Sequence, residues 1–391
     1  MIKAVQSHLR WAIKNASYKI FKNERFRKKV IVNYSNSVFY FKKLNFSNVN
    51  KNSSFADILN YKAILKKKHF KCEELYKGNS LYGISSAFRK YAGHHRKINA
   101  CIEHGVYFGS YVDLKETSKS GFPAVITFSE NRKKHIKNET KKPVFLVGPY
   151  ISYVESFYNE TKVNLLKEKL GKTLLVLPVH SIDRLVTNYD IKSFIKEINK
   201  IKYAHDFNTV LVCLYWKDIL LGRDEIYKNE GFTVVSNGYR EDPYFLSRLK
   251  TFIEISDHTI SNSIGTHIGY SVAMGKPHTV IKQDLEYKGA TDLDLKSESV
   301  LATSSFLEKE EVFKVFKDFD EQISEKQKEI CNKYWGLDKK KSKEVFKFIL
   351  NTCEAIDFSD LNSEQEIRNK VLKLYQDEKN PELRFVLKDA L

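Results

Sequence analysis

The stretch HTISNSIGTHIGYSVAMGKPHTVIK, residues 258–282, decides the predicted fold of this chain. It reads as a short strand, a helix and a second short strand. We expect the helix to begin at Ser263 or Gly265 and to end at Gly275, because glycine adopts the left-handed conformation of helix C-termini. Pro277 then prevents its continuation. The expected apolar face of this helix is formed by three residues, Ile264, Ile268 and Val272.

The start of the helix is rich in glycine, hydroxyl and amide residues. Unpaired backbone N–H groups and the positive end of the helix dipole bind phosphate at such a start. Gly265 would let the backbone approach the anion, Thr266 adds a hydroxyl, and His267 can donate a proton or a hydrogen bond. The alternative is a helix whose own Ser and Thr side chains cap it. We predict a phosphate or diphosphate site formed by Ser261, Asn262, Ser263, Gly265, Thr266 and His267.

Short apolar runs alternate with helical patterns on both sides of this stretch. Between residues 30 and 150 the expected strands are KVIVNYS, SVFYF, KINACIEHG, PAVITFS and PVFLVGP. After residue 150 they are KTLLVLPVHS, TVLVCLYW, FTVVSNG, HTISNS and HTVIK. Apolar runs of this length, separated by helices, predict parallel sheets that are covered on both faces. Residues 305–391 carry a charged helical pattern without a strand signal.

The predicted architecture is α/β, with two doubly wound, Rossmann-like domains and a C-terminal helical tail. We assign residues 1–150 to the first domain, 151–304 to the second, and 305–391 to a tail that packs on both. Ligands of such sheets bind beyond the carboxyl ends of the strands. The expected binding site is therefore the cleft between the two domains.

Composition restricts the class of protein and its partners. Of the 391 residues, 42% are apolar and 13% are aromatic, which is typical of a globular chain. The net charge of +18 predicts an anionic partner: nucleic acid, an acidic membrane surface or a phosphorylated substrate. The five cysteines are scattered and have no CxxC spacing, which fits neither a zinc site nor a disulfide framework. This pattern favours a reducing compartment. Because no apolar run could span a membrane and no secretion signal is recognisable, the expected location is cytoplasmic.

Residues 1–30 concentrate the positive charge. They hold nine Lys or Arg residues against one acid, Glu24, and aromatic residues interleave with the charges. Such a segment can rest on anionic lipid, where each cation adds ~1 kcal/mol, or it can be an ordinary surface helix. The first interpretation predicts a peripheral protein at the inner face of the cell membrane. No RNP, helix-turn-helix or zinc-finger pattern is present, so we expect no nucleic-acid partner.

Residues 261–278 resemble the donor-binding element of GT-B glycosyltransferases and of the related UDP-GlcNAc 2-epimerases. In that element a turn of the NSS-G type opens a helix that ends in a G-x-P signature. The runs INACIEHGVYFG, ITFSENRKKHI and VFLVGPYISYVESFY are similar to proteins of bacterial capsule and O-antigen gene clusters, so the resemblance covers about residues 80–282. It implies a GT-B fold and a nucleotide-sugar substrate without a further cofactor. The E-x(7)-E pair of retaining GT-B enzymes is absent at the matching place, which favours inversion.

Glu103, His104 and Gly105 close a predicted strand of the first domain, on the acceptor side of a GT-B cleft. An inverting transferase needs one base to deprotonate the acceptor hydroxyl, and a histidine with a pKa near 6.5 suits that task. The turn also resembles the His-Gly turn of teichoic-acid polymerases, in which that histidine is the proposed base. Glu103 could orient His104 or be the base itself. The alternative is a hydrogen-bonded turn histidine without a chemical role.

Two further strand ends supply candidate donor contacts. His180 and Ser181 follow the first strand of the second domain, which is a usual position for phosphate contacts. The turn SNGYRED places Gly238, Tyr239 and Arg240 after the strand that leads to the nucleobase and ribose. Arg240 could bind a phosphate or a carboxylate through two hydrogen bonds, or pair with a neighbouring acid. No DxD pair lies at a strand end, so we expect no bound metal.

The leading hypothesis is an inverting, metal-independent glycosyltransferase that moves a sugar from a nucleotide-sugar donor to a capsule or O-antigen acceptor. The acceptor would be a glycan or a lipid-linked glycan. One alternative on the same fold is a CMP-sugar or polyol-phosphate transferase. An alternative of another class is a non-catalytic subunit that binds nucleotide or glycan in a polysaccharide assembly complex.

Overall fold

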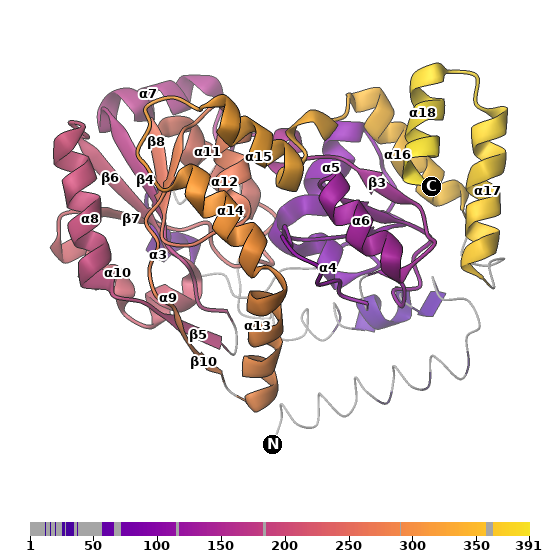
Figure 1. Cartoon of the computed structure of the whole chain (residues 1–391), viewed down its shortest axis with the longest axis horizontal. Coiled ribbons are helices and arrows are strands. Elements are labelled where there is room, and N and C mark those ends of the chain that lie inside the picture. The colour runs from indigo at the N-terminus through magenta and orange to yellow at the C-terminus, as the bar shows by residue number, and fades with distance from the viewer. Residues whose placement is uncertain are drawn as a thin grey trace.

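The protein is an α/β structure built around two parallel sheets, which lie side by side in Figure 1. The computed structural model describes scattered positions between 12 and 37 and the ranges 57–65, 72–114, 117–182, 185–289, 291–356 and 363–391. The side chains at 292–294 and 296–298 are not among those described. Most of the basic segment, residues 1–30, therefore lies outside the described residues.

The first sheet has three parallel strands in the order β1-β2-β3, namely Cys101–Ile102, Val125–Thr127 and Val144–Leu146. The expected strands KINACIEHG, PAVITFS and PVFLVGP are confirmed, although each contributes only two or three residues to the sheet. One face of this sheet packs against α6 (Glu130–Glu139) through a small cluster of Val125, Ile136, Val144 and Leu146.

The second sheet has five parallel strands in the order β7-β6-β4-β8-β9. They are β4 (Thr173–Leu177), β6 (Thr209–Cys213), β7 (Thr233–Val235), β8 (His258–Ser261) and β9 (His278–Val280). The chain builds the sheet outward from β4, first on one side with β6 and β7 and then on the other with β8 and β9. This order is compatible with a Rossmann-like fold, and its reversal between β4 and β8 opens a crevice at the carboxyl ends of these strands.

Helices cover the faces of both sheets. Those before the second sheet are α3 (Tyr61–Ile64), α4 (Lys77–Ser80), α5 (Ile84–Ala92), α6 and α7 (Glu160–Leu170), with the 3-10 turns η2 (Leu81–Gly83) and η3 (Tyr150–Tyr153). The helices that lie between β4 and β9 along the chain are α8 (Ile191–Ala204), α9 (Trp216–Leu220), α10 (Arg223–Asn229), α11 (Phe245–Ile255) and α12 (Thr266–Ala273). Helix α12 ends as expected, because Gly275 follows it with a φ of +73° and Ile268 and Val272 are buried.

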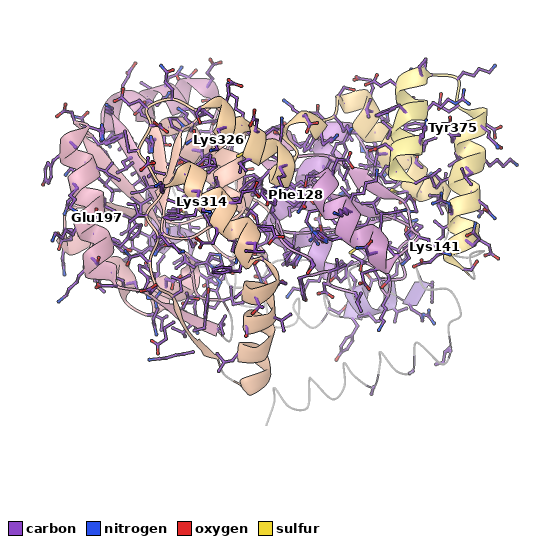
Figure 2. All side chains as sticks on the ribbon, in the orientation of Figure 1. Phe128, Lys141, Glu197, Lys314, Lys326 and Tyr375 are labelled. Carbon is purple, nitrogen blue, oxygen red and sulfur yellow. The ribbon has the colours of Figure 1, made fainter. Side chains whose placement is uncertain are left out.

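The two sheets share one hydrophobic core. Residues of the first sheet such as Ile126 and Phe145 belong to the same buried cluster as Leu175 of β4 and Phe252 of α11. The opposite face of the second sheet packs separately against α8. Phe128, just after β2, is completely buried in the shared core, and Figure 2 labels it near the middle of the molecule. The halves of the molecule are therefore joined by packing as well as by the chain.

The C-terminal helices pack against both sheets. They are α13 (Asp292–Ser304), α14 (Phe306–Phe316), α15 (Glu325–Trp335), α16 (Lys343–Ala355), α17 (Glu364–Asp377) and α18 (Pro381–Ala390), with η4 (Leu337–Lys339). Helix α14 contacts β9, and α15 contacts both α12 and α6. Helix α16 contacts α5, and α18 contacts β3. Residues after 305 contain no strand within the described ranges, as the sequence predicts.

Two features differ from the sequence-based expectation. Strands β5 (Leu185–Asn188) and β10 (Glu286–Gly289) form an antiparallel pair that no apolar run indicated, because only two of its eight positions are buried. The run KVIVNYS, predicted as a strand, is helical at positions 29–34. Continuous apolar runs do not by themselves distinguish a strand from a packed helix, which explains the error. The run SVFYF lies outside the described residues except for Ser37, which is helical.

Candidate functional site

A cavity of about 610 Å³ lies between the two sheets. Every strand of the five-stranded sheet contributes a lining residue just after its carboxyl end: His180, Tyr215, Asn237, Asn262 and Lys282. The three-stranded sheet contributes the turn after β1, and α13 and α14 close the other side with Ala302, Phe306 and Phe313. The cavity thus occupies the crevice that the reversed strand order creates.

Helix α12 begins at the wall of this cavity without a side-chain cap. Gly265 is its N-cap residue and has an extended backbone. The start of the helix therefore offers N–H groups and a positive dipole end to an anion. A Cβ atom on Gly265 would lie 2.9 Å from Cε1 of His267, so glycine makes room here for the imidazole ring. Ser263, Gly265, Thr266 and His267 all line the cavity.

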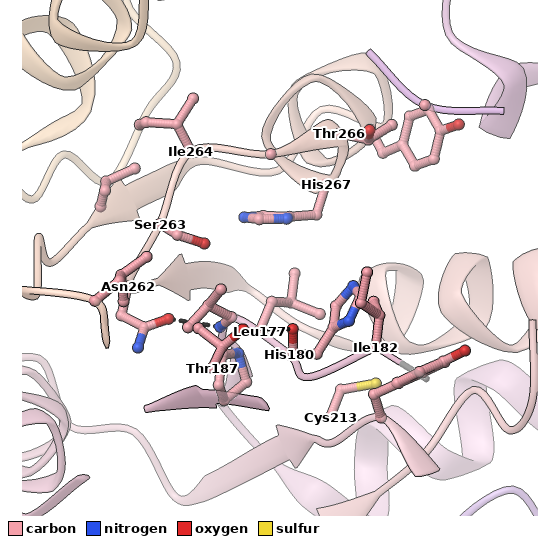
Figure 3. Close-up of a pocket in the computed structure, with 18 of the residues that line it drawn as sticks. Leu177, His180, Ile182, Thr187, Cys213, Asn262, Ser263, Ile264, Thr266 and His267 are labelled. Atoms are coloured by element: carbon pink, nitrogen blue, oxygen red, sulfur yellow. Dashed lines mark hydrogen bonds between the residues drawn. The ribbon is translucent and has the colours of Figure 1, made fainter. Parts of the chain in front are cut away.

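Asn262 connects the loop after β8 with the loop after β4, the two strands between which the strand order reverses. Its Oδ1 accepts a hydrogen bond from the backbone N–H of Val179 at 2.6 Å, which fixes the orientation of the amide (Figure 3). Its Nδ2 is buried and has no hydrogen-bond partner among the residues that the structure describes. A buried donor without an acceptor is costly in a folded protein. An anionic or carbonyl oxygen in the cavity would supply the missing acceptor.

His267 and His180 lie on opposite walls of the cavity (Figure 3). Burial, assisted by the nearby His180, lowers the pKa of His267 to about 4. The pKa of His180 is also lowered by loss of hydration, although Asp218 opposes this shift. At neutral pH, the imidazole of His267 is consequently uncharged. A negative ligand between the two rings would favour their protonated forms.

The candidate base His104 lies next to the start of α12. The backbone N–H of Val106 donates to Oγ1 of Thr266 at 3.1 Å. A Cβ atom on Gly105 would lie 3.7 Å from the same oxygen. His104 and Gly105 both line the cavity. The structure therefore brings the predicted base and the predicted phosphate-binding turn, which are about 160 residues apart, into one site.

A strained turn forms another part of the wall beside His104. Tyr82 has a φ of 60°, a left-handed conformation that is uncommon for a residue other than glycine. Its N–H donates to the carbonyl of Arg240 at 2.5 Å, and its ring centroid lies 6.3 Å from that of His104. At Gly83, a Cβ atom would lie 2.1 Å from the carbonyl oxygen of Pro243. Strain of this kind is often concentrated at functional sites.

Ser261 and Ser181, two of the predicted contacts, do not line the cavity. The hydroxyl of Ser261 donates to the carbonyl of Ser263 and lies 2.9 Å from Nε2 of His278. The hydroxyl of Ser181 donates to Asp218 at 2.9 Å. Both side chains are fully buried, and their hydroxyls serve the protein's own hydrogen bonding. Neither is placed to bind a phosphate.

Glu103 is also buried and does not line the cavity. Its carboxylate pairs with Arg132, Nη2 to Oε1 at 2.7 Å, and also accepts a hydrogen bond from the hydroxyl of Thr127. The carboxylate is therefore engaged inside the first sheet. Of the two candidate bases, His104 faces the cavity and Glu103 does not.

Gly238, Tyr239 and Arg240 also lie outside the cavity lining. The hydroxyl of Tyr239 donates to the carbonyl of Leu65 at 3.1 Å. Arg240 has Glu241 beside it, Nε to Oε1 at 3.4 Å, which agrees with the alternative of pairing with a neighbouring acid. The loop reaches the cavity one residue earlier, through Asn237. The predicted donor contacts of these three residues are therefore not part of this cavity.

Sequence reasoning missed Tyr215, Asn237 and Lys282 as lining residues. Their position directly after predicted strands was the available signal, since ligands of parallel sheets bind at strand carboxyl ends. Lys282 also forms an ion pair with Glu310 of α14 across the cavity wall. Tyr82 had no such signal, because its left-handed backbone cannot be read from residue type.

Within the described ranges, no group of three or more His, Cys, Asp or Glu side chains could hold a metal ion. In the same part of the chain, no helix is both long enough and apolar enough to cross a membrane. No protein-family model matches the chain, and comparison with curated proteins gives no match.

Proposed function

We propose that the protein is a glycosyltransferase of the GT-B type that moves a sugar from a nucleotide-sugar donor to a surface-polysaccharide acceptor. One observation carries this proposal: the uncapped start of α12 meets the turn that bears His104 in a single cavity. The first feature offers hydrogen-bond donors to a phosphate, and the second offers a base. Transfer from a phosphate leaving group to a hydroxyl acceptor needs both.

The diphosphate of the donor would lie at the start of α12. Nδ2 of Asn262 would donate to one phosphate oxygen, and the backbone N–H groups of the first turn to others. Thr266 and His267 border the same space. Hydrogen bonds to charged oxygens are about twice as strong as neutral ones. Preorganised donors of this kind would stabilise the departing diphosphate, so the proposed reaction uses protein groups rather than a metal ion.

His104 would take the proton of the acceptor hydroxyl while that oxygen attacks the anomeric carbon. The donor contacts come from the second sheet and His104 comes from the first, so the sugar would lie between them. Attack from the side opposite the leaving phosphate forms the new C–O bond as the old one breaks, which inverts the anomeric centre. A capsule or O-antigen glycan, free or carried on lipid at the cytoplasmic membrane face, is the proposed acceptor.

The first test is a thermal-shift screen with UDP, GDP, CDP, CMP and dTDP. A nucleotide present at 100 times its Kd should add ~2.7 kcal/mol of apparent stability. If none of the five stabilises the protein, the proposal is refuted. If CMP binds best and a CMP-sugar is the donor, the protein is instead the CMP-sugar transferase given above as the alternative on the same fold.

The second test uses His104→Ala with the matching nucleotide-sugar. We expect nucleotide binding to persist and transfer to be lost, because His104 would contact the acceptor and not the nucleotide. His95→Ala is the matched control, since His95 is exposed and does not line this cavity. Binding without turnover of any donor by the unmodified protein would indicate a non-catalytic binding subunit instead.

A further inference from the structure

The segment 103–111, which carries His104, is held at both ends by one buried guanidinium group. Arg132 of α6 is 0% exposed. At the entry of the segment it donates to Glu103, Nη2 to Oε1 at 2.7 Å and Nε to Oε2 at 3.2 Å. At the exit it donates to two carbonyl oxygens, from Nη1 to Gly109 at 2.9 Å and from Nη2 to Tyr111 at 3.0 Å. A single side chain thus closes the loop.

The middle of the same segment contacts the donor side of the cavity. Besides the hydrogen bond from Val106 to Thr266, the ring of Phe108 packs against Trp335 at a centroid distance of 5.1 Å. Nε1 of Trp335 donates to the carbonyl of Thr266 at 3.1 Å. The indole can pack here only because residue 269 of α12 is glycine: a Cβ atom on Gly269 would lie 2.1 Å from Cγ of Trp335. A shift of the segment would therefore move His104 relative to the start of α12.

We propose that Arg132 is a positioning residue for the transfer reaction, which fixes the segment 103–111 and thereby places His104 against the start of α12. This inference rests on the proposed function, in which His104 is the base. Arginine suits the task because its planar guanidinium group donates hydrogen bonds in several fixed directions at once. The ammonium group of lysine is a compact point charge without this spread of donors. Glu103, expected to be a base or to orient His104 directly, instead pairs with the guanidinium that closes the loop.

The kinetic test replaces the pair together, as Glu103→Gln with Arg132→Gln, so that no buried charge is left without its partner. We expect nucleotide affinity to change by less than about twofold and kcat to fall about 100-fold, because a misplacement of about 1 Å is enough for such a loss. Arg132→Lys keeps a charge beside Glu103 but cannot reach Gly109 and Tyr111 as well, so we expect it to lower kcat too. Arg132→Lys therefore provides the kinetic test if the double variant does not fold.

The matched control is Glu74→Gln with Arg89→Gln. This pair also joins an arginine to a fully buried carboxylate in the first half of the molecule, Nε to Oε1 at 3.0 Å. It does not contact the segment 103–111 in any described interaction. We expect the control to lower the melting temperature without lowering kcat. Equal losses of kcat in the control and in the Arg132 variants would show a general effect of stability and overturn the proposal.

A second readout does not depend on activity. Gly105→Cys with Thr266→Cys places two thiols across the contact between the segment and α12, where a Cβ atom on Gly105 would lie 3.7 Å from Oγ1 of Thr266. Mild oxidation should link them, and the linked peptides can be measured by mass spectrometry. We expect Arg132→Lys to slow this linkage at least tenfold.

The two readouts separate this inference from the proposed function. Slower linkage in a protein that transfers no sugar would support the positioning of the segment while refuting the glycosyltransferase. An unchanged linkage rate would overturn the positioning role, whatever the activity of the protein.

Discussion

Asn262→Asp should abolish donor binding while leaving the fold intact. The carboxylate keeps an oxygen for the N–H of Val179, so the hydrogen bond at 2.6 Å is retained. Nδ2 has no partner in the described structure, so no hydrogen bond within the protein is lost with it. The substitution therefore removes only a donor that we assign to the ligand and adds a negative charge in its place.

The size of the effect follows from these two changes. Loss of a hydrogen bond to a charged oxygen costs ~1.5–3 kcal/mol. Repulsion between the carboxylate and a phosphate about 4 Å away adds ~4 kcal/mol at an effective dielectric constant of about 20. The sum of about 5–7 kcal/mol corresponds to a loss of affinity of roughly 10⁴-fold or more. Burial raises carboxyl pKa values, so the measurement is best made at pH 8, where the side chain is ionised.

Isothermal titration calorimetry with the best nucleotide of the thermal-shift screen measures this loss. Asn79→Asp is the matched control, because Asn79 is a buried asparagine whose Nδ2 donates to Ala100 and whose Oδ1 accepts from Ile102. Asn79→Asp removes the hydrogen bond to Ala100, so the stability of the protein should fall while its affinity for the nucleotide should be unchanged. Unchanged affinity in Asn262→Asp, or a loss equal to that in Asn79→Asp, would refute the assignment of Nδ2 to the ligand.

Three further outcomes are expected. His267→Ala should weaken nucleotide binding by ~1.5–3 kcal/mol, measured by the same calorimetry, because it removes a donor beside the phosphate; equal affinity would argue against a phosphate at this ring. Stability should fall as the pH drops below about 6.5, because burial lowers the pKa of His258 to about 3 and that of His278 well below its usual value. The unfolded chain then binds protons that the native state does not bind, and the slope approaches ~1.4 kcal/mol per pH unit for each histidine well below pH 6.5. Urea unfolding between pH 7 and 5 tests this dependence; a flat profile would contradict it. Residues 1–30 should bind anionic vesicles more weakly as salt rises, since screening shortens the reach of their charge to ~8 Å at physiological ionic strength; equal co-sedimentation of the full chain and of a chain starting at Val30 would exclude this role.

Much of the parallel-sheet framework could be predicted because its signals are local. The apolar runs of β4 and β6 are continuous, and the glycine and proline after α12 mark its end in the residue types themselves. The pair of β5 and β10 gave no such signal, because its partners are about 100 residues apart and its exposed positions break the apolar pattern. The helical positions at 29–34 show the converse error, in which an apolar run is not a strand.

The candidate site was predictable as far as strand ends determine it. His104, Asn262 and His267 were found because each follows a predicted strand or opens the next helix. Ser181 and Ser261 satisfied the same rule but are turned inward, since Asp218 and His278 bind their hydroxyls. Those partners come from other elements, so a local pattern cannot reveal them.

The docking of the C-terminal helices on the first sheet also bears on how the chain folds during synthesis. Phe346 of α16 and Val386 of α18 belong to the same core as Phe145 of β3, and Nδ2 of Asn99 donates to the carbonyl of Cys353. The first half of the chain therefore leaves the ribosome well before the helices that cover it. Contacts over such long sequence separations slow folding and leave apolar surface exposed meanwhile. Nascent chains truncated before α16 should accordingly depend on chaperones far more than the full-length protein does.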